Sequence, residues 1–333
     1  MSTGRLLDRS ANGAGRAIVA AQLARWRAAE RKLAQRAGPT VLHDFRVALR
    51  RLRSTLRAYR PYLVHPQGLR RRLRRLARST NESRNLEVWR GWLSEQARGM
   101  TLRQAVGVKW LRARLAAEQR QANSYVRGRI KDWFPELRAE LRQVTSHAPP
   151  NRPGAPKHRS GTALAKAIRS DTRVLLTQLE SVVSMEDRFA AHRARIAAKR
   201  LRYLLEPFRD ELRGAATVLR QIERLQDALG ELHDAHVFAD ALRAALVEAS
   251  QQRSRAASER VLPWPGPDET SGRPAPPGSR TGLLLLVRRL RMDGDGRFRE
   301  LKTHWLSGGL DELRARLETL ARHCASVNRG GRI

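Results

Sequence analysis

The feature that most constrains this fold is a repeat of the chain on itself. When the 333-residue sequence is shifted by 149 residues, residues 43–93 align with residues 192–242 without a gap, and 15 of the 51 pairs are identical. His43 coincides with His192, and the register holds through both segments. A repeat of this length predicts two halves of related structure that pack about an approximate two-fold axis.

The repeated segments have helical periodicity. At residues 42–59 apolar side chains recur at spacings of three and four, which places them on one face of a helix. Similar patterns, divided by Pro and Gly, predict helices over residues 14–37, 40–59, 68–96, 164–183, 188–209, 214–249, 282–305 and 309–325. Residues 102–145 are predicted to form one long helix or two, with a break near Pro135. Because no segment alternates like a strand over a useful length, we predict an all-α fold.

The chain divides at two stretches rich in Pro and Gly. Residues 148–161 read APPNRPGAPKHRSG, a linker composition with no pattern that builds a core. Residues 250–281 hold six of the eleven remaining prolines together with three glycines, and are expected to form a mobile loop. We therefore predict a first repeat at about residues 14–145, a linker at 146–161 and a second repeat at about 162–325.

A basic stripe lies beside the apolar face of the helix at residues 40–59. His43, Arg46, Arg50, Arg53 and Arg57 follow one another at spacings of 3, 4, 3 and 4. Like charges at such spacings destabilise a helix by about 0.2–0.5 kcal/mol a pair. From residue 43 to residue 78 there are twelve arginines and one acid. We interpret the stripe as an anion-binding face, and a merely solvated basic surface is the alternative.

The overall charge supports a polyanionic partner. The formal net charge is +34, and only seven of the 66 basic residues are lysines. A GC-rich genome would also produce an excess of Arg over Lys. A guanidinium group nevertheless matches the oxygens of phosphate better than an ammonium group does. Bulk charge does not distinguish polyphosphate from nucleic acid, so non-specific nucleic-acid binding is the alternative function.

The pattern His-x-x-Arg-x-x-x-Arg/Lys-Arg-Leu-Arg occurs twice, and it resembles the CHAD domain, the conserved histidine α-helical domain. Two further runs extend the resemblance, Arg84–Val88 in the first repeat and Leu225–Gly230, followed by Asp234, in the second. Asn85 and Glu87 stand where the family tends to have Asp. The resemblance covers residues 14–325. It implies two antiparallel four-helix bundles related by pseudo-two-fold symmetry, with a basic central groove that binds inorganic polyphosphate.

The resemblance also implies which residues bind. The expected contacts are His43, Arg46, Arg50, Arg53 and Arg57 in the first repeat, and His192, Arg195, Lys199 and Arg202 in the second. Further basic residues of the matched helices are candidates for additional contacts: Arg51, Arg71, Arg75, Arg78, Arg200, Arg220 and Arg224. Glu206 occupies the position of Arg57 in the second repeat. That difference predicts a groove that is stronger on the side of the first repeat.

The sequence favours a binding protein over an enzyme. It contains no phosphate-binding Gly-x-x-x-x-Gly-Lys-Ser/Thr loop, no Gly-x-Ser-x-Gly elbow and no Glu-x-Glu-x-Lys strand of a triphosphate tunnel. His233 and His236 have the i,i+3 spacing of a metal pair, but no third ligand is evident, so we expect no metal site and no cofactor. A phosphate-ester or anhydride hydrolase remains the second alternative.

We interpret Trp89, Trp92, Trp110 and Trp133 as core residues; stacking on nucleic-acid bases is their alternative role.

The N-terminus and the longest apolar run bear on location. Residues 1–15 lack the apolar core of a signal peptide, and the run Leu283–Val287 is too short to span a bilayer. We therefore expect a cytoplasmic protein with no membrane partner. From the family resemblance we add association with polyphosphate granules as a hypothesis. The sequence does not predict an oligomeric state.

Overall fold

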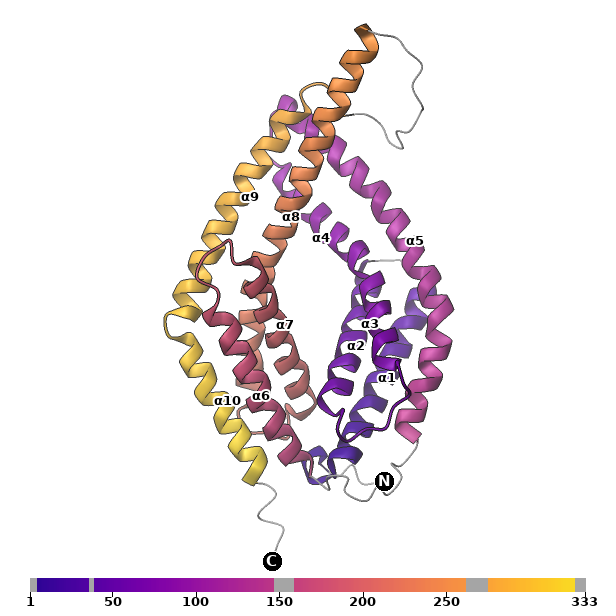
Figure 1. The fold of residues 1–333 in the computed structure, drawn as a ribbon, viewed down its shortest axis with the longest axis vertical. Helices are drawn as coiled ribbons and strands as arrows, with labels where there is room; N and C mark the ends of the chain where they lie inside the picture. The colour runs from indigo at the N-terminus through magenta and orange to yellow at the C-terminus, as the bar shows by residue number, and fades with distance from the viewer. Residues whose placement is uncertain (1–4, 36–38, 147–158, 262–274, 327–333) are drawn as a thin grey trace, which may run out of the picture. The chain divides into compact units, whose positions relative to one another are not determined.

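The computed structural model describes residues 5–35, 39–146, 159–261 and 275–326, which are helical almost throughout (Figure 1). The α-helices are α1 (Ala11–Gln35), α2 (Pro39–Ala58), α3 (Leu69–Ser79), α4 (Asn81–Gln96), α5 (Leu102–Ser146), α6 (Ser160–Glu180), α7 (Arg188–Leu205), α8 (Ala215–Val261), α9 (Ser279–Leu301) and α10 (Gly309–Ser326). Short helical turns occupy Leu6–Asp8, Glu206–Phe208 and Lys302–Leu306. These residues contain no strand, only an isolated bridge between Ser10 and Arg159. The all-α prediction is confirmed.

The first helices of the two repeats begin in the same register. α1 and α6 begin at Ala11 and Ser160, which are 149 residues apart, and α2 and α7 begin at Pro39 and Arg188, with the same separation. The helix starts therefore agree with the shift that aligns the sequences. Pseudo-two-fold symmetry of two four-helix bundles stays a prediction.

The helix predicted over residues 68–96 is wrong, because the chain breaks at Thr80 and forms α3 and α4 there. The hydroxyl groups of Ser79 and Thr80 donate hydrogen bonds to the carbonyls of Leu76 and Ala77, at 2.8 Å each. Such bonds compete with helical hydrogen bonds, which is why Ser and Thr favour helix ends. In the second repeat the aligned residues Ala228–Gly230 continue within α8.

The break predicted at Pro135 is also wrong, because α5 continues through that residue. A proline inside a helix costs about 3 kcal/mol. Here the flanking Phe134 and Leu137 are buried, and the ring of Phe134 lies edge-on to that of Trp26 with centroids 4.6 Å apart. Burial of these side chains keeps the helix continuous.

Helices enter both of the predicted loop regions. α5 ends at Ser146 and α6 begins at Ser160, so most of the predicted linker, residues 147–158, lies outside the described residues. α8 continues to Val261, well into the predicted loop at 250–281, and α9 begins at Ser279. Residues 262–274 of that loop also lie outside the described residues.

The chain forms two compact units, and each unit draws on both repeats. The first comprises the described residues within Met1–Thr80, Val126–Gly230 and Phe298–Ile333, and the second comprises those within Asn81–Tyr125 and Glu231–Arg297. The helices that carry the two predicted stripes, α2 and α7, both belong to the first unit.

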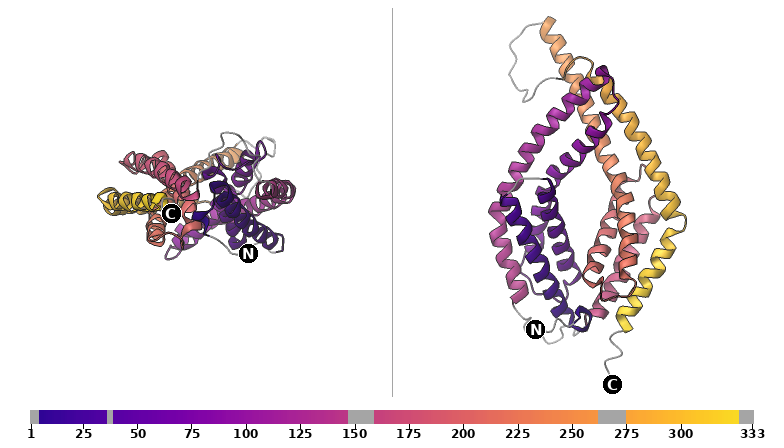
Figure 2. Two further views of the ribbon diagram at one scale, coloured as in Figure 1. Left: turned by 90° about the horizontal axis from the view of Figure 1, so that it is seen from below. Right: turned by 180° about the vertical axis from the view of Figure 1, so that it is seen from behind.

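In the first unit α1 packs against α2, α6 packs against α7 and α10, and α2 contacts both α3 and α7 (Figures 1 and 2). The core of this unit includes Trp26 of α1 and Phe45 of α2, whose ring centroids are 5.5 Å apart. The predicted apolar face of α2 is buried, as expected: Leu42, Phe45, Leu49, Leu52, Leu56 and Tyr59 are each at most 7% exposed. Burial of that face leaves the basic stripe of α2 at the surface.

The second unit has its own apolar core, built from α4, the first part of α5, the later part of α8 and α9. Trp89 and Trp92 pack against Phe238, with ring centroids 6.1 and 5.5 Å apart. Where α5 and α9 meet, a Cβ at Gly107 would lie 2.1 Å from the carbonyl oxygen of Ser279, so only glycine fits there. Trp89, Trp92 and Trp110 are buried, which confirms their interpretation as core residues.

Candidate anion-binding site

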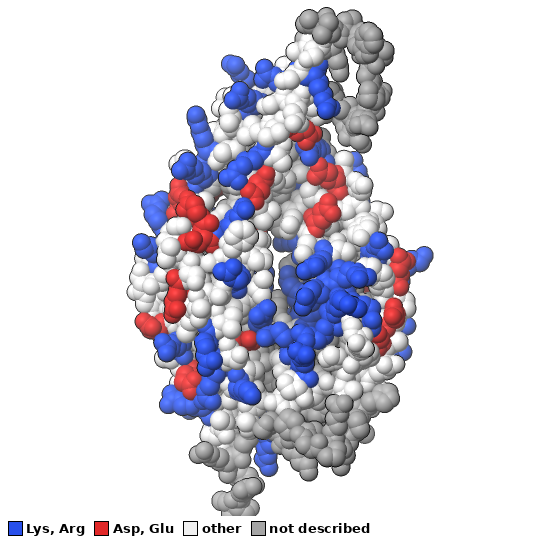
Figure 3. Space-filling model, viewed as in Figure 1, with Lys and Arg blue, Asp and Glu red and all other residues white. Residues whose placement is uncertain are grey.

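Arginines from α2, α3 and α7 meet in one region of the first unit. Arg53 lies at its centre, and burial of its side chain lowers the pKa of its guanidinium group. The positive charges of Arg74, Arg78, Arg200 and Arg50 lower that pKa further. Figure 3 shows basic side chains gathered over the region where Figure 1 places α2 and α3. A cation held among other cations is in an unfavourable state that a bound anion would relieve.

The same region extends to three further arginines. The pKa of Arg70 is lowered by burial and by the charges of Arg60, Arg74 and Arg57, and the pKa of Arg200 is lowered by burial and by the charge of Arg57. We refer to the whole set as the arginine cluster: Arg50, Arg53, Arg57, Arg60, Arg70, Arg74, Arg78 and Arg200.

One carboxylate, that of Asp171 on α6, is bound to the arginine cluster. Arg57 donates through Nη1 to Asp171 Oδ1 at 3.0 Å and through Nη2 to Oδ2. Asp171 is only 4% exposed, so this pair fixes the end of α2 to α6. Within the described parts of the chain, no carboxylate forms an ion pair with the other seven arginines. Most of the cluster's charge is therefore not neutralised by the protein.

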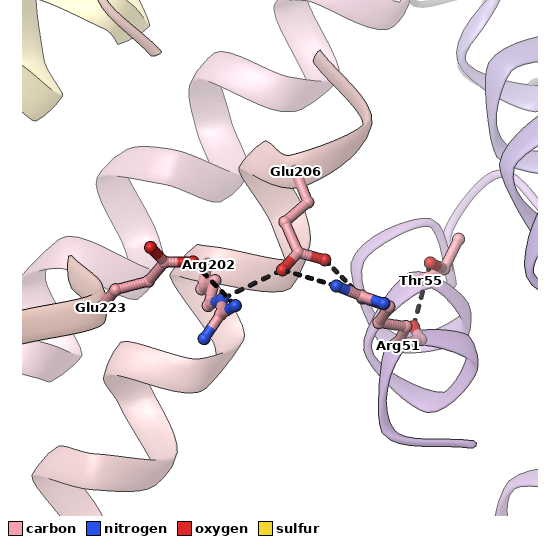
Figure 4. A network of polar contacts seen from close by, with 5 residues as sticks. All are labelled: Arg51, Thr55, Arg202, Glu206 and Glu223. Atoms are coloured by element: carbon pink, nitrogen blue, oxygen red, sulfur yellow. Dashed lines mark hydrogen bonds and ion pairs between the residues drawn. The ribbon is translucent and has the colours of Figure 1, made fainter. Parts of the chain in front are cut away.

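A second group of basic residues lines a pocket of about 230 Å³ between α1, α2, α7 and α8. Its arginines are Arg25, Arg51, Arg202, Arg209 and Arg220. Two glutamates share this pocket (Figure 4). Arg51 donates to both oxygens of Glu206, at 2.6 and 3.1 Å, and Arg202 donates to Glu206 at 2.9 Å and pairs with Glu223 at 2.7 Å. Burial alone would lower the pKa of Arg51, but its hydrogen bond to Glu206 raises it.

Arg46 and Arg195, the second cations of the two predicted stripes, contact the backbone at positions that are one residue apart under the shift. Arg46 donates through Nη1 to the carbonyl oxygen of Thr80 and, at 2.8 Å, to its hydroxyl oxygen. Arg195 lies over Gly230, where an added Cβ would be 3.5 Å from Arg195 Nε. Both arginines therefore hold a stripe helix against the helix that follows it.

His192, Arg195 and Lys199 lie together on α7. The pKa of His192 is lowered first by burial and then by the positive charges of Arg195 and Lys199. This lowered pKa favours the neutral form of His192 in the free protein. His43, its counterpart on α2, is exposed.

The predicted basic row on α3 contains only one member of the arginine cluster, Arg78. Its other two residues are Arg71 and Arg75. Arg71 and Arg75 are exposed, and Arg75 lies 5.9 Å from the ring centroid of Trp133. Arg220 and Arg224 are exposed on α8. Arg60, Arg70 and Arg74 were not among the predicted contacts. The i,i+4 spacing of Arg70, Arg74 and Arg78 on α3 could have indicated two of them. The interpretation of Trp133 as a core residue is wrong, because its ring is half-buried beside Arg129, at 5.2 Å.

The described residues also bear on metal sites and membrane spans. Among the described residues, no group of three or more His, Cys, Asp or Glu side chains is placed to hold a metal ion. None of the described helices combines the length and the apolar character that a membrane span requires.

Comparison with known proteins identifies the family. The CHAD domain profile matches residues 17–243, which is more than half of the chain, so the protein belongs to the CHAD domain family. No curated protein sequence matches the chain. The crystal structure of the CHAD domain from the plant Ricinus communis aligns with 94% of this chain and 93% of its own, at 19% identity and a TM-score of 0.59. PptA from Streptomyces chartreusis aligns with 90% of this chain and 99% of its own, at 15% identity and a TM-score of 0.63. At these identities the similarity shows a shared fold.

Proposed function

We propose that this protein binds inorganic polyphosphate on the arginine cluster, without catalysis. The observation that carries the proposal is the concentration of eight arginines, seven on α2, α3 and α7 and Arg60 in the turn after α2, with a single bound carboxylate, Asp171. The cluster contains Arg50, Arg53 and Arg57 of the predicted stripe.

Polyphosphate suits this surface because its charges are closely spaced and it carries no bases to be read. Guanidinium groups bind phosphate oxygens through two parallel hydrogen bonds, so adjacent arginines can bind adjacent phosphates. The remaining stripe residues His43, Arg46, His192, Arg195 and Lys199 would extend the contact. Arg202 already binds two glutamates, so we expect a smaller contribution from it.

One observation favours nucleic acid as a second candidate ligand. The half-buried ring of Trp133 lies beside Arg75 and Arg129. An aromatic ring among cations can stack on a base while the cations bind the backbone. Nucleic acid therefore belongs in the same experiment as a competitor.

The test is binding of polyphosphate at about 0.3–0.5 M salt, where exposed charges are well screened. We expect Arg53→Ala/Arg74→Ala/Arg78→Ala to lower the affinity about 100-fold, because each arginine contributes about 1 kcal/mol net. The matched control is Arg213→Ala/Arg314→Ala/Arg322→Ala, which removes three exposed arginines of the same unit. Duplex DNA and RNA serve as competitors.

Equal losses in the two triple variants, or displacement of polyphosphate by nucleic acid, would contradict the proposal in favour of a general polyanion binder. Release of orthophosphate by the purified protein with Mg²⁺ or Mn²⁺ would contradict the non-catalytic role.

Recruitment to polyphosphate granules is the cellular form of the same proposal. It rests on the family resemblance. A tagged copy is expected to coincide with granules in cells that contain them, and a diffuse signal in those cells would count against it.

A further inference from the structure

The sequence repeat aligns the residues of the arginine cluster with the residues of the pocket around Glu206. Under the 149-residue shift, Arg53, Arg57, Arg60, Arg70, Arg74 and Arg78 align with Arg202, Glu206, Arg209, Leu219, Glu223 and Asp227. Six arginines of the first repeat thus correspond to two arginines, one leucine and three acids in the second. Five of the six second-repeat residues line the pocket.

The two groups are also built alike in three dimensions. Each includes an arginine from the other repeat at positions that the shift makes equivalent, Arg200 and Arg51, and the pocket also includes Arg25 of the first repeat. Arg200 lies near Arg53 and Arg57, whose charges interact with its own. Arg51 lies at the corresponding place, hydrogen-bonded to Glu206. The two surfaces therefore share a framework and differ in charge.

In the pocket the protein supplies its own anion. The carboxylate of Glu206 accepts hydrogen bonds from Arg51 and Arg202, and Glu223 pairs with the other side of Arg202. A phosphate group that binds these arginines would have to displace a carboxylate already held at 2.6–3.1 Å. It would also approach the negative charges of both glutamates.

We propose that Glu206 and Glu223 restrict polyphosphate binding to one of these two surfaces, the arginine cluster. They occupy Arg51 and Arg202 of the second-repeat pocket and confine the ligand to the arginine cluster. This inference rests on the proposed function and deepens it, because it states where on the framework the anion binds and which residues exclude it elsewhere.

The first test uses the wild-type protein, arginine modification by phenylglyoxal and mass spectrometry, with and without tripolyphosphate. Arg74 and Arg78 of the cluster, and Arg209 and Arg220 of the pocket, are all exposed and available to the reagent. We expect tripolyphosphate to protect Arg74 and Arg78 several-fold and to leave Arg209 and Arg220 unprotected. Protection of the pocket pair to the same extent or more would overturn the inference alone. Protection of neither pair would overturn the proposed function, and the inference with it.

The second test removes the negative charges of the two glutamates from the pocket. We expect Glu206→Gln/Glu223→Gln to raise the number of tripolyphosphate ions bound per chain from one to two, measured by isothermal titration calorimetry. The matched control Glu312→Gln/Glu318→Gln changes the net charge equally, at two α10 glutamates that pair with Arg316 and Arg169. It is expected to keep one site. A natively folded pocket variant that still binds one ion would overturn the inference; if that variant does not fold, the modification experiment decides.

Discussion

The arginine cluster of the first repeat and the Glu206 pocket of the second share several buried residues but differ in how their arginines are paired. Leu52 and Leu201, Leu56 and Leu205, and Leu76 and Leu225 are aligned pairs, and all six side chains are buried. Three aligned pairs outside the core, Arg57 and Glu206, Arg74 and Glu223, and Arg78 and Asp227, differ in sign. Burial of apolar side chains maintains the helical framework, since it stabilises each helix by roughly the same amount whatever the outer residues are. Function can thus change at a few surface positions without any change of fold.

The comparison also shows two ways of placing a carboxylate. The acid that binds the first-repeat stripe is Asp171, which is buried on α6 of the second repeat and anchors Arg57. The residue that the shift aligns with Asp171 is Gln22, also buried and neutral. In the second repeat the acid is on the stripe helix's own continuation, at Glu206. An acid behind the arginines orients them, whereas an acid among them occupies the place of the ligand.

The largest expected effect comes from transferring one second-repeat residue to the first. Arg74→Glu introduces the residue found at the aligned position 223. We expect polyphosphate affinity at about 0.3 M salt to fall about 30-fold, because the change removes a phosphate-binding cation and gives Arg53 an internal anion. Fluorescence anisotropy with labelled polyphosphate measures it. A loss no greater than that of Arg220→Glu would mean that the two surfaces are equivalent.

Removing the anchoring carboxylate should affect folding. Asp171→Asn leaves the Arg57 guanidinium partly buried without its anion, and we expect the free energy of unfolding to fall by about 2 kcal/mol. Urea denaturation measures the change. Glu318→Gln, at an exposed pair with Arg169, is the control and should cost less than about 0.5 kcal/mol. Equal effects of the two substitutions would contradict the anchoring role of Asp171.

A smaller effect is expected from pH through His192. Its folded pKa is lowered by burial and by Arg195 and Lys199, so the unfolded chain binds this proton more readily than the folded one. The free protein should therefore lose stability as pH falls below about 6.5. A bound anion opposes that shift, so polyphosphate should bind a few-fold more tightly at pH 6 than at pH 8. NMR titration of His192 with and without polyphosphate checks both statements, and an unchanged pKa would show that the anion does not reach His192.

The smallest expected effect concerns the two helix contacts of Arg46 and Arg195. An alanine Cβ at position 230 would lie 3.5 Å from Arg195 Nε, an ordinary contact distance. Since Gly disfavours a helix interior, Gly230→Ala should stabilise the protein by about 0.5 kcal/mol, measured by thermal unfolding. Destabilisation would show that Arg195 needs a residue without a Cβ at position 230. Arg46 likewise depends on the backbone, since it donates to the carbonyl oxygen of Thr80.

The sequence by itself determined the helical class, the buried face of α2, the register of the repeat and the presence of a concentrated basic surface. These are short-range properties, since periodicity and composition depend on neighbours within a few turns. The resemblance in the doubled His/Arg motif also indicated the family. Predictions failed where long-range packing competes with local preference, as at Pro135, which Phe134 and Leu137 hold inside a helix.

Only the tertiary structure decided which arginines act together. Arg70 and Arg74 join Arg53 because α3 packs on α2, and Arg57 is bound because Asp171 reaches it from a helix 114 residues away in sequence. Arg202 shares a stripe pattern with Arg53, yet two glutamates hold it. The energy of an electrostatic interaction depends on the distance between the charges and on their burial. The spacing of residues along one helix determines neither quantity for residues on different helices.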